Sequence, residues 1–206
     1  PVVVPVADEI ARYISDSHLE APTLVGHSMG GTIAMSIASR HPDAIGRLMV
    51  VDMFPDLGVL FAGPNASAEA RAAVAEQVRA GIAGSSGDAR RAQTEATIAS
   101  MVRNEAMRPV AVRHSMESDA DTSGRAMADL ITTNLTADIG RYDGPMRVLW
   151  VVPAGTPFDQ PTMANFYRMA YAATPQAVLT HIPDSAHFIM WDAPDRFRQE
   201  LRDFLA

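Results

Sequence analysis

The chain of 206 residues contains no cysteine, which excludes disulfide bonds, thiolate metal sites and cysteine nucleophiles. It also contains no apolar run long enough to span a bilayer. Basic residues are the minority charge, with 17 Lys and Arg against 24 Asp and Glu, and the net charge is −7. This balance argues against nucleic acid and against a membrane as partners.

Signals for cofactors are also missing. No segment combines the glycine spacing and the lysine of a phosphate-binding loop. No group of histidine, aspartate and glutamate has the spacing of metal ligands. We therefore expect a protein that works with neither a metal nor another cofactor.

The first residues carry no initiator methionine and no basic region of the kind that begins a signal peptide. We interpret the chain as a fragment or a processed product. Its compartment stays open: cytoplasmic, or periplasmic or secreted if a targeting segment was lost.

The most informative stretch that is present runs from residue 22 to residue 40. An apolar strand pattern at 22–26 leads into Gly26-His-Ser-Met-Gly30, and a helical pattern follows at 32–40. A Gly-x-Ser-x-Gly motif between a strand and a helix predicts a nucleophile elbow, a tight turn that exposes the serine hydroxyl. Ser28 is the predicted nucleophile, and side chains at Gly26 and Gly30 are predicted to collide with the turn. The ordinary alternative is a tight turn with a surface serine.

A serine nucleophile needs a base, and His187 is the predicted one. It follows a strand predicted at 177–182 and precedes a terminal helix at 194–206, so it lies at the sheet edge where ligands of parallel sheets bind. The other histidines have ordinary explanations. His18 and His41 lie at helix ends, His181 lies within a strand, and His114 lies within the insertion. The side chain of His27 is expected to point away from Ser28.

Two aspartates are candidates for the acid that orients the base. Asp52 directly follows a strand predicted at 47–51, whereas Asp159 follows a strand at 146–152 only after a loop. Asp52 is preferred slightly. The ordinary alternatives are a partner of loop amides for Asp52 and a helix N-cap for Asp159. Asp184 and Asp192 are remote candidates because they lie on the histidine's own loop.

The order of elements predicts an α/β fold with a mostly parallel sheet flanked by helices. We expect one core formed by residues 1–53 and 143–206, with a helical insertion at 54–142. Within that insertion, strand patterns disappear and four helices are predicted, near 66–80, 88–107, 109–118 and 122–133.

These features resemble the α/β-hydrolase superfamily. The matching motifs are Gly-His-Ser-Met-Gly-Gly at 26–31 and, after an intervening aspartate, Asp-Ser-Ala-His-Phe at 184–188 before the terminal helix. The resemblance covers essentially the whole chain and implies a serine esterase or lipase with the insertion as a helical cap. It also implies that the backbone amide of Met29 is an oxyanion-hole donor.

Two departures from the family pattern shape the expectations. The strands that usually precede the elbow, and the loop that supplies a second oxyanion donor, have no counterpart here. The strand at 22–26 is therefore predicted to be a bare sheet edge. We expect a homo-oligomer, association with a missing N-terminal segment, or impaired activity. The loop Gly155-Thr-Pro-Phe-Asp159 is one residue longer than the family's Gly-x-x-Asp, which shifts the preference to Asp52.

The main hypothesis is a serine hydrolase that cleaves esters or lactones, with small or medium hydrophobic acyl substrates. Methionines of the insertion suit an adaptable apolar pocket, although plain helix packing is the preferred explanation: Met101, Met107, Met116 and Met127. The rival hypotheses are a catalytically impaired binding module of the same fold, and a carbon–carbon bond hydrolase or cofactor-free peroxidase.

Overall fold

A computed structural model describes residues 1–153 and 155–206 of the chain. The loop expected at 153–158 includes Ala154, which lies outside the described residues. No helix among the described residues combines the length and the apolar composition needed to cross a membrane.

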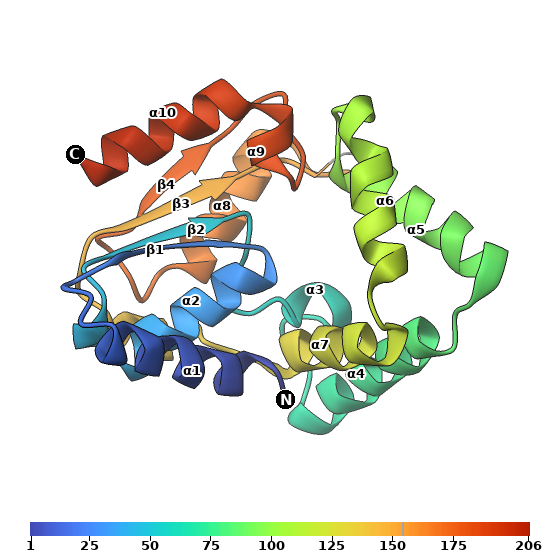
Figure 1. Cartoon of the computed structure of the whole chain (residues 1–206), viewed down its shortest axis with the longest axis horizontal. Helices are drawn as coiled ribbons and strands as arrows, with labels where there is room; N and C mark the ends of the chain where they lie inside the picture. Colours follow the sequence, from blue (N-terminus) through green and yellow to red (C-terminus); the bar gives the residue numbers. More distant parts are fainter. Residues whose placement is uncertain (154) are drawn as a thin grey trace.

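The described residues form a parallel sheet of four strands in the order β1-β2-β3-β4 (Figure 1). Gly26 is level with Val50, which is level with Val148. The strands are β1 (Thr23–His27), β2 (Arg47–Val51), β3 (Met146–Trp150) and β4 (Val178–His181). The predicted parallel sheet flanked by helices is therefore confirmed.

Helices cover both faces of this sheet (Figure 1). Leu48 and Val50 of β2 pack toward α1 (Val3–Asp16), α2 (Met29–Arg40) and α8 (Gln160–Ala170). The alternating residues Met49 and Val51 pack toward Phe204 of α10 (Pro194–Leu205). Buried apolar residues on both faces are typical of a parallel sheet between helix layers.

The outer strand β1 is less covered than its neighbour. Val25 is level with Met49, on the face where α10 packs, yet 45% of Val25 is exposed whereas Met49 is buried. Within the described sheet β1 pairs with β2 alone. β1 is therefore an edge strand of the described sheet, as predicted for the strand at 22–26.

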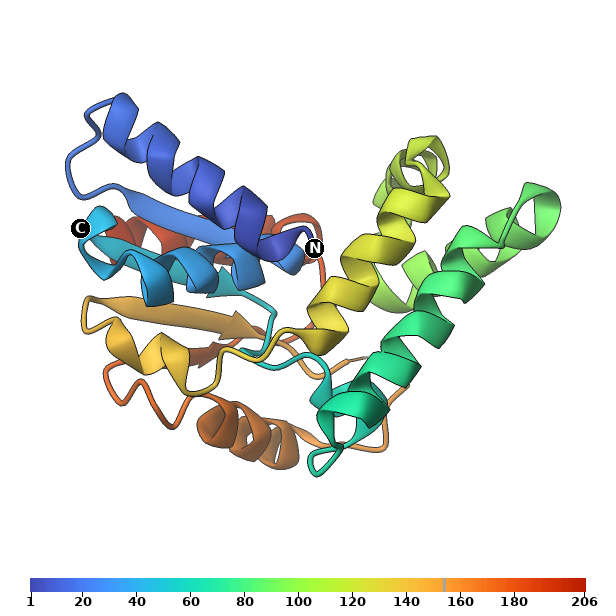
Figure 2. The ribbon, with the colours of Figure 1, turned by 90° about the horizontal axis from the view of Figure 1, so that it is seen from below.

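The segment between β2 and β3 contains helices and no strand (Figure 2). Two of these helices begin at a side chain that accepts a backbone N–H, which is Ser67 for α4 and Asp119 for α7. The helices are α3 (Val59–Ala62), α4 (Ala68–Ala83), α5 (Gly87–Met101), α6 (Arg108–Glu117) and α7 (Ala120–Thr132). Four of them correspond to the predicted helices, but α5 ends at Met101 rather than near 107.

The helical segment consists of two packed pairs, α4 with α7 and α5 with α6 (Figures 1 and 2). The first pair is tied to the sheet side of the molecule. Asp129 of α7 accepts hydrogen bonds from the amides of Val2 and Val3 at 2.6 and 2.7 Å. Arg71 of α4 forms a two-point ion pair with Asp56 at 2.6 and 2.8 Å. The second pair is attached elsewhere, to the loop that carries His187.

Candidate active site

Ser28 lies at the junction of β1 and α2, with φ 54° and ψ −125°. Residues other than glycine rarely adopt a positive φ, and such strain concentrates at functional sites. The Ser28 amide donates to the carbonyl of Val51 at 3.1 Å, which continues the pairing of β1 with β2 beyond the strands. Ser28 is thus held in a strained turn at the carboxyl end of the sheet.

The turn itself explains one of the two glycines of the motif. A Cβ on Gly26 would lie 2.3 Å from the carbonyl oxygen of Gly30, so no side chain fits there. A Cβ on Gly30 would meet no atom within 4 Å, so the predicted collision at Gly30 is wrong. The next residue, Gly31, has less room than Gly30, because a Cβ on Gly31 would lie 3.1 Å from a methyl group of Val50.

Asp52 follows β2 directly and also has a positive φ, of 50°. Its Oδ2 lies 2.7 Å from Nδ1 of His187. Its Oδ1 accepts hydrogen bonds from the hydroxyl of Tyr167 at 3.0 Å and from the amide of Val151 at 3.3 Å. The carboxylate is therefore held on both oxygens, and only 11% of the side chain is exposed.

Asp159, the other candidate acid, begins α8. Its Oδ1 accepts a hydrogen bond from the amide of Thr162 at 2.9 Å. Hydrogen bonding to the side chain of Thr162, and secondarily to its amide, lowers the pKa of Asp159. The structure therefore shows Asp159 in the helix-capping role and brings Asp52, rather than Asp159, to His187. The helix that Asp159 caps carries Tyr167, which contacts Asp52.

His187 lies on the loop between β4 and α9 (Ile189–Asp192), with 20% of its side chain exposed. Its backbone carbonyl lies 2.8 Å from Nε2 of His27, and the two rings lie 4.6 Å apart at their centroids. Because His27 immediately precedes Ser28, these contacts hold the histidine loop against the elbow. The three sequence-predicted residues Ser28, Asp52 and His187 thus share the carboxyl edge of the sheet.

Sequence reasoning assigned no part in the site to His27, although its position beside Ser28 was a usable signal. Burial, and secondarily the charge of His187, lower the pKa of His27 to about 4. The ring of His27 is therefore neutral near pH 7, with one N–H to donate. That N–H is assigned to Nε2 because the group facing it is the carbonyl of His187.

Tyr167 is a second residue that sequence reasoning missed, and no sequence signal singled it out. Its ring is stacked against Phe54 and Trp150, with centroids 4.3 and 5.2 Å apart. Burial, together with the charge of Asp52, raises the pKa of Tyr167 well above its usual value. The hydroxyl therefore remains protonated and donates to the Asp52 carboxylate.

The amino end of α2 provides an environment for negative charge. Met29 is its first residue, so the Met29 amide is one of the N–H groups that a helix leaves without an intrahelical acceptor. The first turn of α2 carries no acidic side chain. Free amides and the helix dipole at such an end favour a bound anion or a developing oxyanion.

Among the described residues, no three His, Asp or Glu side chains are grouped so that they could hold a metal ion.

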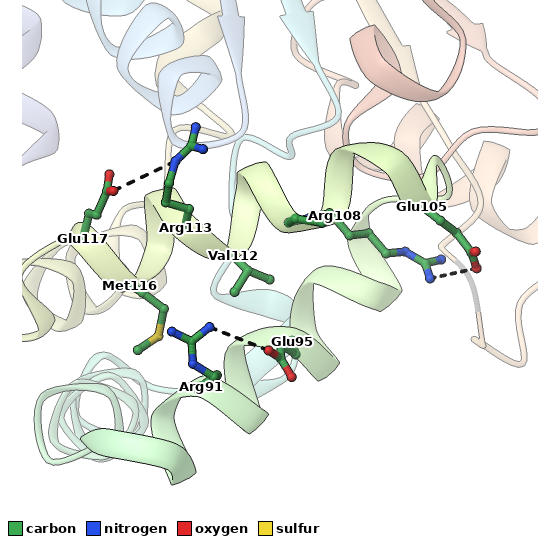
Figure 3. Close-up of a pocket in the computed structure, with 9 residues that line it drawn as sticks. Arg91, Glu95, Glu105, Arg108, Val112, Arg113, Met116 and Glu117 are labelled. Carbon is green, nitrogen blue, oxygen red and sulfur yellow. Dashed lines mark hydrogen bonds and ion pairs between the residues drawn. The ribbon is translucent and has the colours of Figure 1, made fainter.

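A groove of about 910 Å³ lies away from the site, between α5 and the segment 105–117 (Figure 3). Arg91 faces Glu95 there, and Arg113 faces Glu117, as paired charges. The groove is lined by Arg91, Glu95, Glu105, Arg108, Pro109, Val112, Arg113, Met116 and Glu117, and so by none of the predicted catalytic residues.

The methionines of the insertion are engaged in packing. Met101, Met107 and Met116 pack against the buried cluster of α5 and α6, together with Phe188 and Trp191 from the histidine loop. Met127 packs against the main core. These contacts fit the preferred explanation, helix packing, and they place apolar side chains next to the loop of His187.

Comparisons with known proteins agree with this architecture. Residues 2–200 match the model of the Alpha/beta hydrolase family. The chain is 28% identical to the sn-1-specific diacylglycerol lipase ABHD11 of Mus musculus over 189 residues, which are 89% of this chain and 58% of that protein. The chain therefore spans less than two thirds of the length of this curated relative.

Two solved structures share the fold at low sequence identity. A hydrolase from Pseudomonas aeruginosa PA01 superposes with a TM-score of 0.76 and 17% identity, over 97% of this chain and 70% of that chain. A thermophilic esterase from Thermogutta terrifontis gives a TM-score of 0.70 and 22% identity, over the same shares of the two chains. With a family match over nearly its whole length and the parallel sheet expected of that fold, the chain belongs to the alpha/beta hydrolase family.

Proposed function

We propose that this chain is a serine hydrolase that cleaves carboxylic esters or lactones through an acyl-enzyme on Ser28. His187 acts as the general base and Asp52 as the acid that orients it. The observation that carries the proposal is the 2.7 Å contact between His187 Nδ1 and Asp52 Oδ2, beside a serine held in a strained turn.

The contacts of Asp52 support its role over that of Asp159. A carboxylate accepts the proton on Nδ1 of His187, so the lone pair of that ring lies on Nε2, the tautomer a general base needs. The second oxygen of Asp52 is occupied by Tyr167 and Val151, which keeps the carboxylate from turning away. Asp159 is engaged at the start of α8 instead.

The reaction follows from these assignments. Ser28 Oγ attacks the substrate carbonyl carbon while its proton passes to His187 Nε2, and the carbonyl oxygen becomes an oxyanion that the Met29 amide stabilises. The tetrahedral intermediate expels the alcohol, which takes the proton back from Nε2. Water then attacks the acyl-enzyme and loses a proton to His187 Nε2. The second tetrahedral intermediate releases the acid, and the proton passes from Nε2 to Ser28 Oγ, which restores the free enzyme.

The proposed substrate class is an ester with a small or medium hydrophobic acyl group. A curated relative of the chain is named as a diacylglycerol lipase, which is an esterase of lipids. We assign the helices of residues 54–142 as a cap beside the site. Met101 and Met107 of this segment pack on the same apolar cluster as Phe188, the residue after His187.

The test is a substrate panel: p-nitrophenyl esters of increasing acyl length, aliphatic lactones, and a diketone for carbon–carbon cleavage. We expect turnover of short or medium esters or of lactones, and a loss of about 10,000-fold or more in Ser28→Ala, because nucleophile and base act as one unit. Equal turnover in Ser28→Ala, or cleavage of the diketone alone, contradicts the proposal.

A further inference from the structure

The carboxylate of Asp192 provides three of the hydrogen bonds at the junction between the loop that carries His187 and the helical segment. Asp192 Oδ1 accepts hydrogen bonds from the amides of Arg103 and Asn104, at 3.0 and 2.8 Å. Asp192 Oδ2 accepts a hydrogen bond from the amide of Ala186, at 2.8 Å. One side chain thus joins the turn after α5 to the residue that precedes His187.

Further contacts close the same junction. The Phe188 amide donates to the carbonyl of Met101 at 3.2 Å, and the Asn104 side-chain amide donates to the carbonyl of Trp191 at 3.2 Å. The rings of Phe188 and Trp191 stack at 4.6 Å with an interplanar angle of 13°. Together they pack on the α5–α6 cluster of Ile98, Val102, Ala111 and Val112.

The position of this junction links it to the proposed chemistry. Ala186 and Phe188 are the two neighbours of His187 in the chain. The Phe188 amide is hydrogen-bonded directly to the turn 101–104, and the Ala186 amide is connected to that turn through the carboxylate of Asp192. The hydrogen bonds of Asp192 go to the backbone amides of Ala186, Arg103 and Asn104, whereas the His187 ring is hydrogen-bonded to Asp52. Its influence on the ring therefore passes through the backbone of the loop.

We propose that Asp192 is a positioning residue for the base, and that it makes the placement of His187 depend on the docking of the α5–α6 pair. This inference rests on the proposed function of His187. Without the carboxylate, the amides of Ala186, Arg103 and Asn104 lose their acceptor and the loop shifts relative to the elbow. A displacement of about 1 Å at a reacting group lowers the rate by about 100-fold.

The test compares Asp192→Ala with Asp195→Ala. Asp195 is three residues away, 94% of its side chain is exposed, and its side chain pairs with Arg198 only locally, so Asp195→Ala removes the same charge without touching the junction. We expect Asp192→Ala to lower kcat on a p-nitrophenyl ester by 10- to 100-fold with KM changed less than threefold. Asp195→Ala should stay within twofold of the unaltered chain.

A readout that needs no turnover separates this inference from the proposed function. The proton between His187 Nδ1 and Asp52 is observable as a downfield NMR signal. We expect it to broaden and exchange faster in Asp192→Ala and to be unchanged in Asp195→Ala. If the unaltered chain cleaves neither an ester nor a lactone, the proposed function fails, and this signal still decides whether Asp192 positions the ring.

Two further variants keep the inference testable if Asp192→Ala does not fold. Asp192→Asn retains one acceptor oxygen, but its NH₂ faces either the Ala186 amide or the amides of Arg103 and Asn104, so its effect should be intermediate. Asn104→Ala weakens the junction from the other side without altering the loop, and its effect should be in the same direction. An unchanged kcat and an unchanged downfield signal in folded Asp192 variants would overturn the inference, as would a rise in KM alone.

Discussion

The two halves of the proposed active site are held in place by different means. The elbow at 26–31 is shaped by backbone packing: Gly26 has no room for a Cβ, and α2 behind it is buried along most of its length. The loop at 186–192 packs Phe188 and Trp191 on the α5–α6 cluster, and the polar contacts of Asp52, His27 and Asp192 orient His187. The proposed nucleophile is thus placed mainly by close packing, and the proposed base is oriented mainly by hydrogen bonds.

This difference predicts how each half responds to substitution. Close packing leaves no room to adjust, so a misfit in the elbow disturbs the sheet and α2 together. A lost hydrogen bond at a partly exposed loop costs less stability, but it releases a group whose geometry decides the rate. Damage to the elbow should therefore appear first in folding, and damage to the loop first in activity.

The largest effect is expected in the elbow. Gly26→Ala places a methyl group 2.3 Å from a backbone oxygen and should abolish the folded protein, as judged by circular dichroism and solubility. Gly30→Ala is the matched control, since its Cβ meets nothing and alanine favours a helix over glycine by about 1 kcal/mol. Equal melting temperatures for the two variants would refute the steric account.

The next effect is expected at the base. Asp52→Asn keeps the shape of the side chain but no longer stabilises the required tautomer and charge of His187. We expect a loss of about 10,000-fold in kcat, by analogy with such a change in serine proteases, with a melting temperature within a few degrees. Comparable activity in Asp52→Asn would remove Asp52 from the mechanism.

His27 provides a pH test of the contact between the two halves. In the unfolded chain its pKa is near 6.5, and burial lowers it to about 4 in the folded protein. Between these pH values the unfolded state binds more protons at His27 than the folded state does. The contribution of neutral His27 to the free energy of unfolding is therefore complete above pH 6.5 and is lost as the pH falls toward 4. The loss is at most about 3 kcal/mol.

The measurement is the free energy of unfolding in urea across this pH range for the unaltered chain and for His27→Gln. Glutamine does not titrate and retains an N–H that can reach the His187 carbonyl. We expect the decline with falling pH to be smaller in His27→Gln. Parallel pH profiles for the two proteins would show that His27 is not the group responsible.

The smallest effect is expected at Asp159. Asp159→Ala removes the N-cap of α8 and should lower the free energy of unfolding slightly, measured by urea denaturation. Its effect on kcat should be minor beside that of Asp52→Asn. A loss of activity as large as that of Asp52→Asn would make Asp159 the acid and reverse the assignment.

The sequence predicted the sheet well because its strands carry strong local signals. The strand predicted at 47–51 matches β2, in which four consecutive apolar residues are followed directly by Asp52. Gly26 was also predictable, because the motif itself implies the tight turn. The prediction was wrong for Gly30, which lies inside the first turn of α2, where the helix backbone leaves space for a side chain.

Other features depend on contacts between segments that are distant in the sequence, and they could not be predicted from the sequence. The end of α5 at Met101 is set by a turn that docks on Asp192, almost 90 residues later in the chain. The contact of Tyr167 with Asp52 depends on how α8 packs on the sheet. The choice between Asp52 and Asp159 stayed open for the same reason, since both follow strands at the same edge.

The most direct test of the account is covalent labelling with a fluorophosphonate, followed by mass spectrometry of the digested protein. The account predicts a single adduct on Ser28 that disappears in Ser28→Ala and forms far more slowly in His187→Ala. No adduct under native conditions, an adduct on another residue, or equal labelling in His187→Ala would contradict it.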